Sequence, residues 1–293
     1  MTSGQFTGTE TLEAPELAAE ASALPRGASR LRRMLLAVAP PLVAFAFFVG
    51  IWYLVTYVIL SPDRRFLMPP AHEVVRNGFF NGTNLHEQLS ATWDTTKVAA
   101  TGLGIAFVLG MLVAIIMSQG KWLERALYPY AVIVQVTPIL AIVPLIALWF
   151  GYDFRARVVV CVMISVFPII TNTLHGLLTV ESSLHDLFRL HHARGVKRLV
   201  KLQLPHAVPD IFVGLRVSAG LSVIGAIVGE FFFRQGTPGL GRLLDFYRAY
   251  LQSDLLVSTL IFCCLLGIVA FWGVGFIGRQ LTKSWYEEGH SSS

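Results

Sequence analysis

The sequence predicts an all-α integral membrane protein with six transmembrane helices. Apolar residues make up 54% of the 293 residues and charged residues only 14%, a balance unlike that of soluble globular domains. The apolar residues gather into six runs, each long enough for the roughly 20 residues that cross a bilayer as a helix. Polar intervals separate these runs, and the longest interval among the last three runs covers residues 181–210.

Residues 1–33 are predicted to form a disordered cytoplasmic tail that ends in a basic anchor. The segment is rich in Ala, Glu, Ser, Thr and Gly up to Leu24, and a basic run then follows at Arg26, Arg30, Arg32 and Arg33. The first predicted span covers residues 34–60, which carry no charge. This run exceeds the roughly 7–15 apolar residues of a signal peptide and no small-residue cleavage site follows it, so we expect the span to be retained.

The segment 61–97 mixes both signs of charge and contains Pro62, Pro69 and Pro70. We expect a short helix around 71–80 at the outer surface, with Val74 and Val75 on its apolar side. Packing against the helix bundle is its predicted role, and contact with another protein is the alternative.

Five more spans follow the first one. Their predicted ranges are 98–120, 126–150, 158–180, 211–233 and 255–278. The fifth span contains Arg216 and Glu230, which lie about 20 Å apart along a helix, so both charges can sit near opposite interfaces. Small residues recur every four positions and predict close helix contacts: Gly102, Ala106, Gly110 and Ala114, then Gly225 and Gly229.

The distribution of Lys and Arg predicts the orientation. With the N-terminus inside, 14 of these cations fall on the inner side and 9 on the outer side. Because basic residues favour the cytoplasmic side, both termini are predicted to be cytoplasmic, including a tail at 283–293. The same orientation places the 181–210 interval in the cytoplasm.

The 181–210 interval predicts a pair of short amphipathic helices. Apolar residues recur there at helical spacing: Leu184, Leu187 and Phe188, then Val196, Leu199 and Val200. Pro205 is predicted to end the second helix. A basic flank accompanies this stripe: Arg189, Arg194, Lys197, Arg198 and Lys201. Docking into a groove of a soluble partner and resting on anionic lipid headgroups both fit this pattern.

The same residues resemble the cytoplasmic loop E-A-A-x3-G-x9-I-x-L-P of the permease subunits of binding-protein-dependent ABC importers. Asp186 stands for the Glu, Leu187 and Phe188 for the two Ala, and His192 for the Gly, while Leu202, Leu204 and Pro205 fit I-x-L-P. In that family the loop is a coupling helix that inserts into the ATP-binding subunit. The resemblance therefore implies that 184–200 does so here, with a bend altered by the bulkier residues and Gly195 as an alternative turn residue. The coupling residues so implied are Leu184, Asp186, Leu187, Phe188, His192, Gly195, Leu199, Leu204 and Pro205.

Further segments extend the resemblance over most of 60–280. Residues 66–75, 137–151, 167–177 and 204–233 look like the branch that imports taurine, alkanesulfonates, nitrate, pyrimidine precursors of thiamin and riboflavin. This implies a type I importer-like permease of the bacterial inner membrane that forms the path for a small organic or oxyanion solute.

The resemblance also implies partners and cofactors. The expected partners are two cytoplasmic ATP-binding subunits, a second permease that is either a copy or a paralogue, an extracytoplasmic solute-binding protein and membrane lipid, without nucleic acid. ATP and magnesium are expected in the partner ATPase, and no cofactor in this chain.

Polar residues within spans are candidates for the translocation path, because burial without a partner is costly. They are Gln135, Thr137, Asn172, Thr173, Ser218, Ser222 and Glu230. Structural roles are the alternative: we expect Asn172 and Thr173 to bond across helices, and Glu230 to be paired or at the outer mouth. Pro138 and Pro144 should kink the third span, either at a gate or as ordinary membrane prolines.

Several chemistries have no counterpart in the sequence. It contains no G-x4-G-K-[ST] phosphate-binding loop, and the glycine-rich stretch 236–241 is predicted to be a turn. Cys161, Cys263 and Cys264 lack metal-ligand spacing, and the adjacent His191 and His192 do not share a helix face. The chain is therefore predicted to be non-catalytic and without a metal site. A secondary transporter and a non-transporting membrane scaffold remain the alternative functions.

Overall fold

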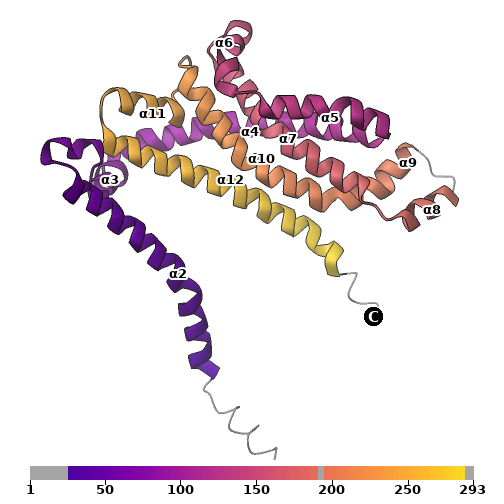
Figure 1. Cartoon of the computed structure of the whole chain (residues 1–293), viewed down its shortest axis with the longest axis horizontal. Helices are drawn as coiled ribbons and strands as arrows, with labels where there is room; N and C mark the ends of the chain where they lie inside the picture. Colours follow the sequence, from indigo (N-terminus) through magenta and orange to yellow (C-terminus); the bar gives the residue numbers. More distant parts are fainter. Residues whose placement is uncertain (1–25, 191–194, 288–293) are drawn as a thin grey trace, which may run out of the picture. The chain divides into compact units, whose positions relative to one another are not determined.

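The structure is a computed structural model that describes residues 26–190 and 195–287. All regular elements within these residues are helices, as the sequence predicts (Figure 1). The chain divides into two compact units, residues 1–62 and 63–293. The predicted permease domain 34–282 is thus split after its first span, and each unit is described by itself.

The described residues of the first unit form one long helix. Helix α2 (Arg26–Leu54) continues as the π-helix η1 (Val55–Ile59), and Val38–Ile59 is long and apolar enough to cross a membrane. The buried Thr56 hydroxyl is satisfied within the helix, because Oγ1 donates to the carbonyl of Trp52 at 3.0 Å. The predicted disordered tail was wrong for residues 26–33, which are helical. Residues 1–25 of that prediction lie outside the described residues.

The chain then continues through thirteen described elements. They are η2 (Pro62–Leu67), α3 (Ala71–Val75), η3 (Arg76–Phe80), α4 (Gly82–Ser118), α5 (Lys121–Val136), α6 (Ile139–Phe150), α7 (Phe154–Leu178), α8 (Ser182–Leu190), α9 (Val196–Arg198), η4 (Leu199–Gln203), α10 (Leu204–Phe232), α11 (Leu240–Ala249) and α12 (Ser253–Glu287).

Helix α7 lies between α4 and α10, and glycines set the close spacing of the three helices. Gly102 and Gly110 of α4 face Cys161 and Ile169 of α7. On the other side, a Cβ at Gly225 of α10 would lie 2.7 Å from the Cα of Cys161. Such contacts leave room for hydrogen only, which confirms the predicted close approach of small residues.

The same contacts give the direction of each helix. Gly102 of α4 contacts Cys161 of α7, and eight residues later Gly110 contacts Ile169, also eight residues later. Residue numbers therefore rise in the same direction, and these two helices run parallel. Contacts between α7 and α10 run in opposite senses, as do those between α10 and α12. Because α4 and α7 are parallel, the segment between them must return the chain from one end of the bundle to the other.

That returning segment is broken. The predicted span 126–150 is two helices, α5 and α6, bent by 97°. Thr137 is extended, with φ −63° and ψ 123°, as expected for a residue before proline, and Pro138 begins the new direction. Pro144 stays inside α6. Among the described residues, five helices can span a membrane, or six with this bent pair taken as one.

Some helix boundaries differ from the prediction, at the start of α4 and at the start of α10. Helix α4 starts at Gly82 rather than residue 98, and the Asn81 side chain caps it by accepting from the amide of Thr83 at 3.2 Å. Pro205 does not end a helix, because the π-turn η4 leads directly into α10 and Pro205 lies in its first turn, where no amide is needed. In the short helix α3, Val74 is buried but Val75 is 43% exposed, contrary to the prediction.

Candidate functional site

The antiparallel pair α7–α10 carries a candidate site at each end (Figure 1). The α7 C-terminus and the α10 N-terminus hold the 181–203 loop, and we call this the loop end. The α7 N-terminus and the α10 C-terminus hold residues 233–241, and we call this the clamp end.

At the loop end, α8 presents apolar side chains to the surroundings. Leu184 and Leu187 are exposed and Phe188 is half-buried, as the helical spacing suggests. Leu190 is 78% exposed and extends the same surface. The sequence analysis missed Leu190, although its position three residues after Leu187 was a usable signal. Asp186 is exposed on this helix, and His192 lies outside the described residues.

The base of the loop is fixed to the helix pair. Gln203 is buried and its Nε2 donates to the carbonyl of Leu177 at 3.2 Å. A Cβ at Gly176 would lie 2.9 Å from the Cα of Ala207, so α7 and α10 touch directly below the loop. The base of the loop therefore contacts both helices.

The second half of the loop does not form one continuous exposed stripe. Val196 is 74% exposed and Val200 is exposed as well, but Leu199 and Leu204 pack inward against the buried cluster of Leu177, Ala207 and Ile211. Leu204 and Pro205 also line a shallow groove between α4 and α10. Gly195 begins the second half with φ +58°, a conformation that glycine adopts readily.

At the clamp end, Glu230 is fully buried and binds the start of α11. Its Oε2 accepts from Thr95 Oγ1 at 2.8 Å and from the amide of Gly241 at 3.0 Å. Thr95 Oγ1 in turn accepts from the amide of Leu240 at 2.9 Å. Glu230 is thus paired by hydrogen bonds, one of the two outcomes that we expected for it.

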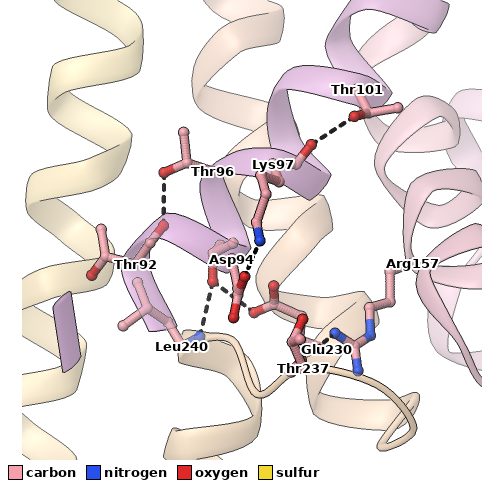
Figure 2. Close-up of polar contacts among 10 residues, drawn as sticks. Thr92, Asp94, Thr96, Lys97, Thr101, Arg157, Glu230, Thr237 and Leu240 are labelled. Carbon is pink, nitrogen blue, oxygen red and sulfur yellow. Dashed lines mark hydrogen bonds and ion pairs between the residues drawn. The ribbon is translucent and has the colours of Figure 1, made fainter. Parts of the chain in front are cut away.

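Arg157 binds the preceding part of the same loop. It is 2% exposed, and Nε donates to the carbonyl of Phe233 at 3.1 Å. Nη1 donates to the carbonyl of Thr237 at 2.9 Å (Figure 2). Nη2 donates to the carbonyl of Gln235. Arg157 and Thr95 were not predicted as site residues, and Arg157 directly precedes the predicted span 158–180, where a flanking cation is common.

Of the other predicted path residues, Ser218 and Thr173 contact a neighbouring helix, whereas Ser222 and Asn172 bond within their own helix. Ser218 Oγ donates to the carbonyl of Ser165 on α7 at 2.6 Å, and Thr173 Oγ1 contacts Met111 Sδ on α4 at 3.5 Å. Ser222 Oγ donates to the carbonyl of Ala219 at 2.9 Å within its own helix. Asn172 also bonds within its helix, to the carbonyl of Pro168 at 2.8 Å, so the prediction that it bonds across helices was wrong.

Gln135, Thr137 and Pro138 meet at the break between α5 and α6. Gln135 and Pro138 are exposed, and Thr137 Oγ1 donates back to the carbonyl of Ile133 at 2.6 Å. Ile139, just after the break, packs against an apolar cluster that includes Ala156 and Val160 of the first half of α7. Among the described residues, no group of three or more His, Cys, Asp or Glu side chains is placed to hold a metal ion.

Comparisons with known proteins agree with this architecture. Residues 106–283 match the family described as binding-protein-dependent transport system inner membrane component. A Haemophilus influenzae protein named "Probable ABC transporter permease protein" is 29% identical over 241 residues, covering 81% of this chain and 94% of the relative. The formylaminopyrimidine transport permease of Halalkalibacterium halodurans is 30% identical over 233 residues, covering 79% and 90%.

One solved structure shares the fold. It is a crystal structure of a bacterial ABC transporter involved in the import of the acidic polysaccharide alginate, with a TM-score of 0.58 and 15% identity. The match covers 85% of this chain and 99% of that chain.

Proposed function

The chain belongs to the inner membrane components of binding-protein-dependent transport systems, and from this premise we propose that it couples solute import to ATP hydrolysis in a separate cytoplasmic subunit. The family and the apolar helices make it a multi-pass ABC permease. The finer proposal is that residues 184–200 are the coupling element and that the chain itself does not hydrolyse ATP.

The exposed apolar surface of α8 carries this proposal. Leu184, Leu187 and Leu190 project from a short helix within a loop whose base is fixed by Gln203 and Gly176. Exposed leucines on a short amphipathic helix suit insertion into a groove of a partner. Such a partner would displace α7 and α10 together, because both helices hold the base. ATP and magnesium would bind in this partner.

The translocation path is proposed to pass the break between α5 and α6. Within a bilayer, non-helical backbone is tolerated where it is buried in protein or lines a water-filled cavity. The break exposes Gln135 and Pro138, which supports a position on the path, facing a second permease subunit. The named solute of the formylaminopyrimidine relative supports a small organic or oxyanion solute for this chain.

The directions of the helices support the proposed orientation. If the loop end faces the cytoplasm, α4, α7 and α12 end there and the clamp end faces outward. A solute-binding protein would then deliver its solute at the clamp end, and the chain would lie in the bacterial inner membrane with both termini in the cytoplasm.

The decisive experiment is affinity purification of the intact complex with measurement of its ATPase activity. We expect an ATP-binding subunit to copurify, and Leu187→Arg and Phe188→Ala to lose it or to uncouple its activity. Leu67→Arg and Phe80→Ala are matched controls, since both residues are exposed but distant in sequence from α8. If no ATPase copurifies and all variants behave like wild type, a secondary transporter or a scaffold replaces this proposal.

A further inference from the structure

The loop of residues 233–241 is held by two buried side chains of opposite charge. Arg157 binds three carbonyl groups of its first half, and Glu230 with Thr95 binds the amides of Leu240 and Gly241 at its end. Helices α4, α7 and α10 each supply one of these side chains. These three side chains make five hydrogen bonds with the loop, in addition to the bond from the Gln235 amide to the carbonyl of Tyr152 and the ion pair of Arg234 with Asp245.

Space around the loop is closed as well. A Cβ at Gly239 would overlap the carboxylate of Glu230, and a Cβ at Gly241 would overlap the carbonyl of Ile227. The loop therefore lies directly on the end of α10, with no room for a lining of side chains. Substitution of either glycine would force the loop away from its anchor.

Both charged side chains form hydrogen bonds with the loop. Glu230 and Arg157 lie on facing helices that nearly touch, since a Cβ at Gly229 would be 2.9 Å from the Cα of Arg157. Although the two helices are this close, Oε1 of Glu230 has no hydrogen-bond partner among the described residues. The guanidinium of Arg157 donates to loop carbonyls. Burying a charged group is costly unless it is hydrogen-bonded. Here three loop carbonyls bind the guanidinium, and the Gly241 amide together with Thr95 binds Oε2 of Glu230.

The body to which the loop is fixed also carries the coupling loop. Helices α7 and α10 contact each other at four levels, at Gly176, Gly214, Gly225 and Gly229, with distances from a Cβ to the opposite backbone of 2.7–2.9 Å. Close packing of this kind resists sliding and bending. A displacement at one end of the α7–α10 pair would therefore move the other end.

We infer that Arg157 and Glu230 are positioning residues, which fix the 233–241 loop to α7 and α10 so that this loop moves as one body with the coupling loop. This inference rests on the proposed function. We call Arg157 and Glu230 with their bonds to this loop the clamp. The clamp would transmit the nucleotide state of the ATP-binding subunit to the surface where solute would enter.

Hydrogen–deuterium exchange of the full chain tests the clamp directly, since Leu240 and Gly241 amides are among its bonds. In Arg157→Ala and Glu230→Ala we expect exchange within 233–241 to accelerate at least about tenfold, because hydrogen bonds to charged groups are strong. Tyr250→Ala is the control: its side chain is exposed at the end of α11 and its removal should leave this exchange unchanged. Unchanged exchange in both clamp variants overturns the inference.

Conservative variants distinguish a general folding defect from a specific loss of the bonds between Arg157, Glu230 and the loop. If an alanine variant also exchanges faster throughout 205–229, it has lost the helix pair, and Glu230→Gln and Arg157→Lys decide instead. Faster exchange confined to 233–241 in these variants supports the clamp, and exchange equal to that of wild type contradicts it.

The transmission is tested in the complex with copurified ATP-binding subunits. We expect magnesium with a non-hydrolysable ATP analogue to change exchange at both 181–190 and 233–241 in wild type. In Glu230→Gln the response at 181–190 should remain and the response at 233–241 should vanish. A response that persists at 233–241 refutes transmission through the clamp. Failure of any ATP-binding subunit to copurify refutes the proposed function instead, while the exchange of the isolated chain still decides the clamp.

Discussion

At the scale of single residues, the clearest prediction concerns Gly225. A Cβ there would lie 2.7 Å from the Cα of Cys161, so Gly225→Ala must push α10 away from α7. Overpacking of this kind costs about 1–3 kcal/mol, and we expect a lower midpoint of thermal unfolding in detergent. Gly104→Ala is the matched control, with nothing within 4 Å of its new Cβ. An equal midpoint for both variants would contradict the packing described above.

Tyr247 gives a pH-dependent prediction. Its side chain lies in α11, outside the spans, and its hydroxyl donates to Glu87 Oε2 at 3.2 Å. Burial raises the pKa of Tyr247, and the carboxylate of Glu87 raises it further. In the unfolded chain the pKa of a tyrosine is about 10. Above that pH the unfolded state has lost a proton that the folded state keeps, so stability falls as the pH rises.

Tyr247→Phe should therefore flatten the loss of stability between about pH 9 and 11, measured as the unfolding midpoint across that range. At neutral pH the variant should be destabilised by about 1 kcal/mol through loss of the hydrogen bond. Tyr250→Phe is the control, because Tyr250 is exposed on the same turn. A slope unchanged by Tyr247→Phe would exclude this residue as its source.

The sequence anticipated those residue contacts that follow a short repeat, and missed those that join distant segments. Gly102 and Gly110 could be read as a packing face, because four-residue spacing alone places them on one side of a helix. Arg157 could not be connected to its loop, since its hydrogen bonds join residues 76 to 80 positions apart. Asn172 was misassigned because a polar side chain in a span can bond its own backbone as well as a neighbour.

At the scale of elements, the break between α5 and α6 is open to test. If it lies on a water-filled path, a cysteine at Gln135 should react with a membrane-impermeant thiol reagent applied to intact complexes. Leu148→Cys is the matched control, since Leu148 on α6 is 78% exposed but lies away from the break. Both variants require Cys264→Ser, because Cys264 is an exposed native thiol. Equal reactivity at the two positions would argue against a path at the break.

The break also shows how far element boundaries follow from sequence. Pro138 signalled a kink, but proline alone does not determine an angle of 97°. Likewise, Pro205 looked like a helix end because the π-turn that accommodates it depends on backbone pairing, which has no residue signature. The start of α4 at Gly82 was hidden because its first turns are polar, and apolar runs report only the part of a helix inside the bilayer.

At the scale of the whole molecule, helix direction determines the topology. Parallel α4 and α7 require α5 and α6 together to cross the bilayer once, whereas a re-entrant pair would place α4 and α7 antiparallel. With α10 and α12 alternating in direction, the clamp end and the loop end lie on opposite sides. If the first unit adds one crossing, the number of crossings is even and the two termini share a side.

Reporter fusions distinguish these arrangements. We expect green fluorescent protein to fluoresce when fused at either terminus, and alkaline phosphatase to be active when inserted after Gly236, because Gly236 belongs to the exposed clamp-end loop. The reason is that 14 of the 23 Lys and Arg residues then lie on the cytoplasmic side, as the charge rule favours. Phosphatase activity at the C-terminus with fluorescence at the N-terminus would mean that the α5–α6 pair does not cross. The parallel packing of Gly102 and Gly110 on α7 would then have to be abandoned together with the proposed path.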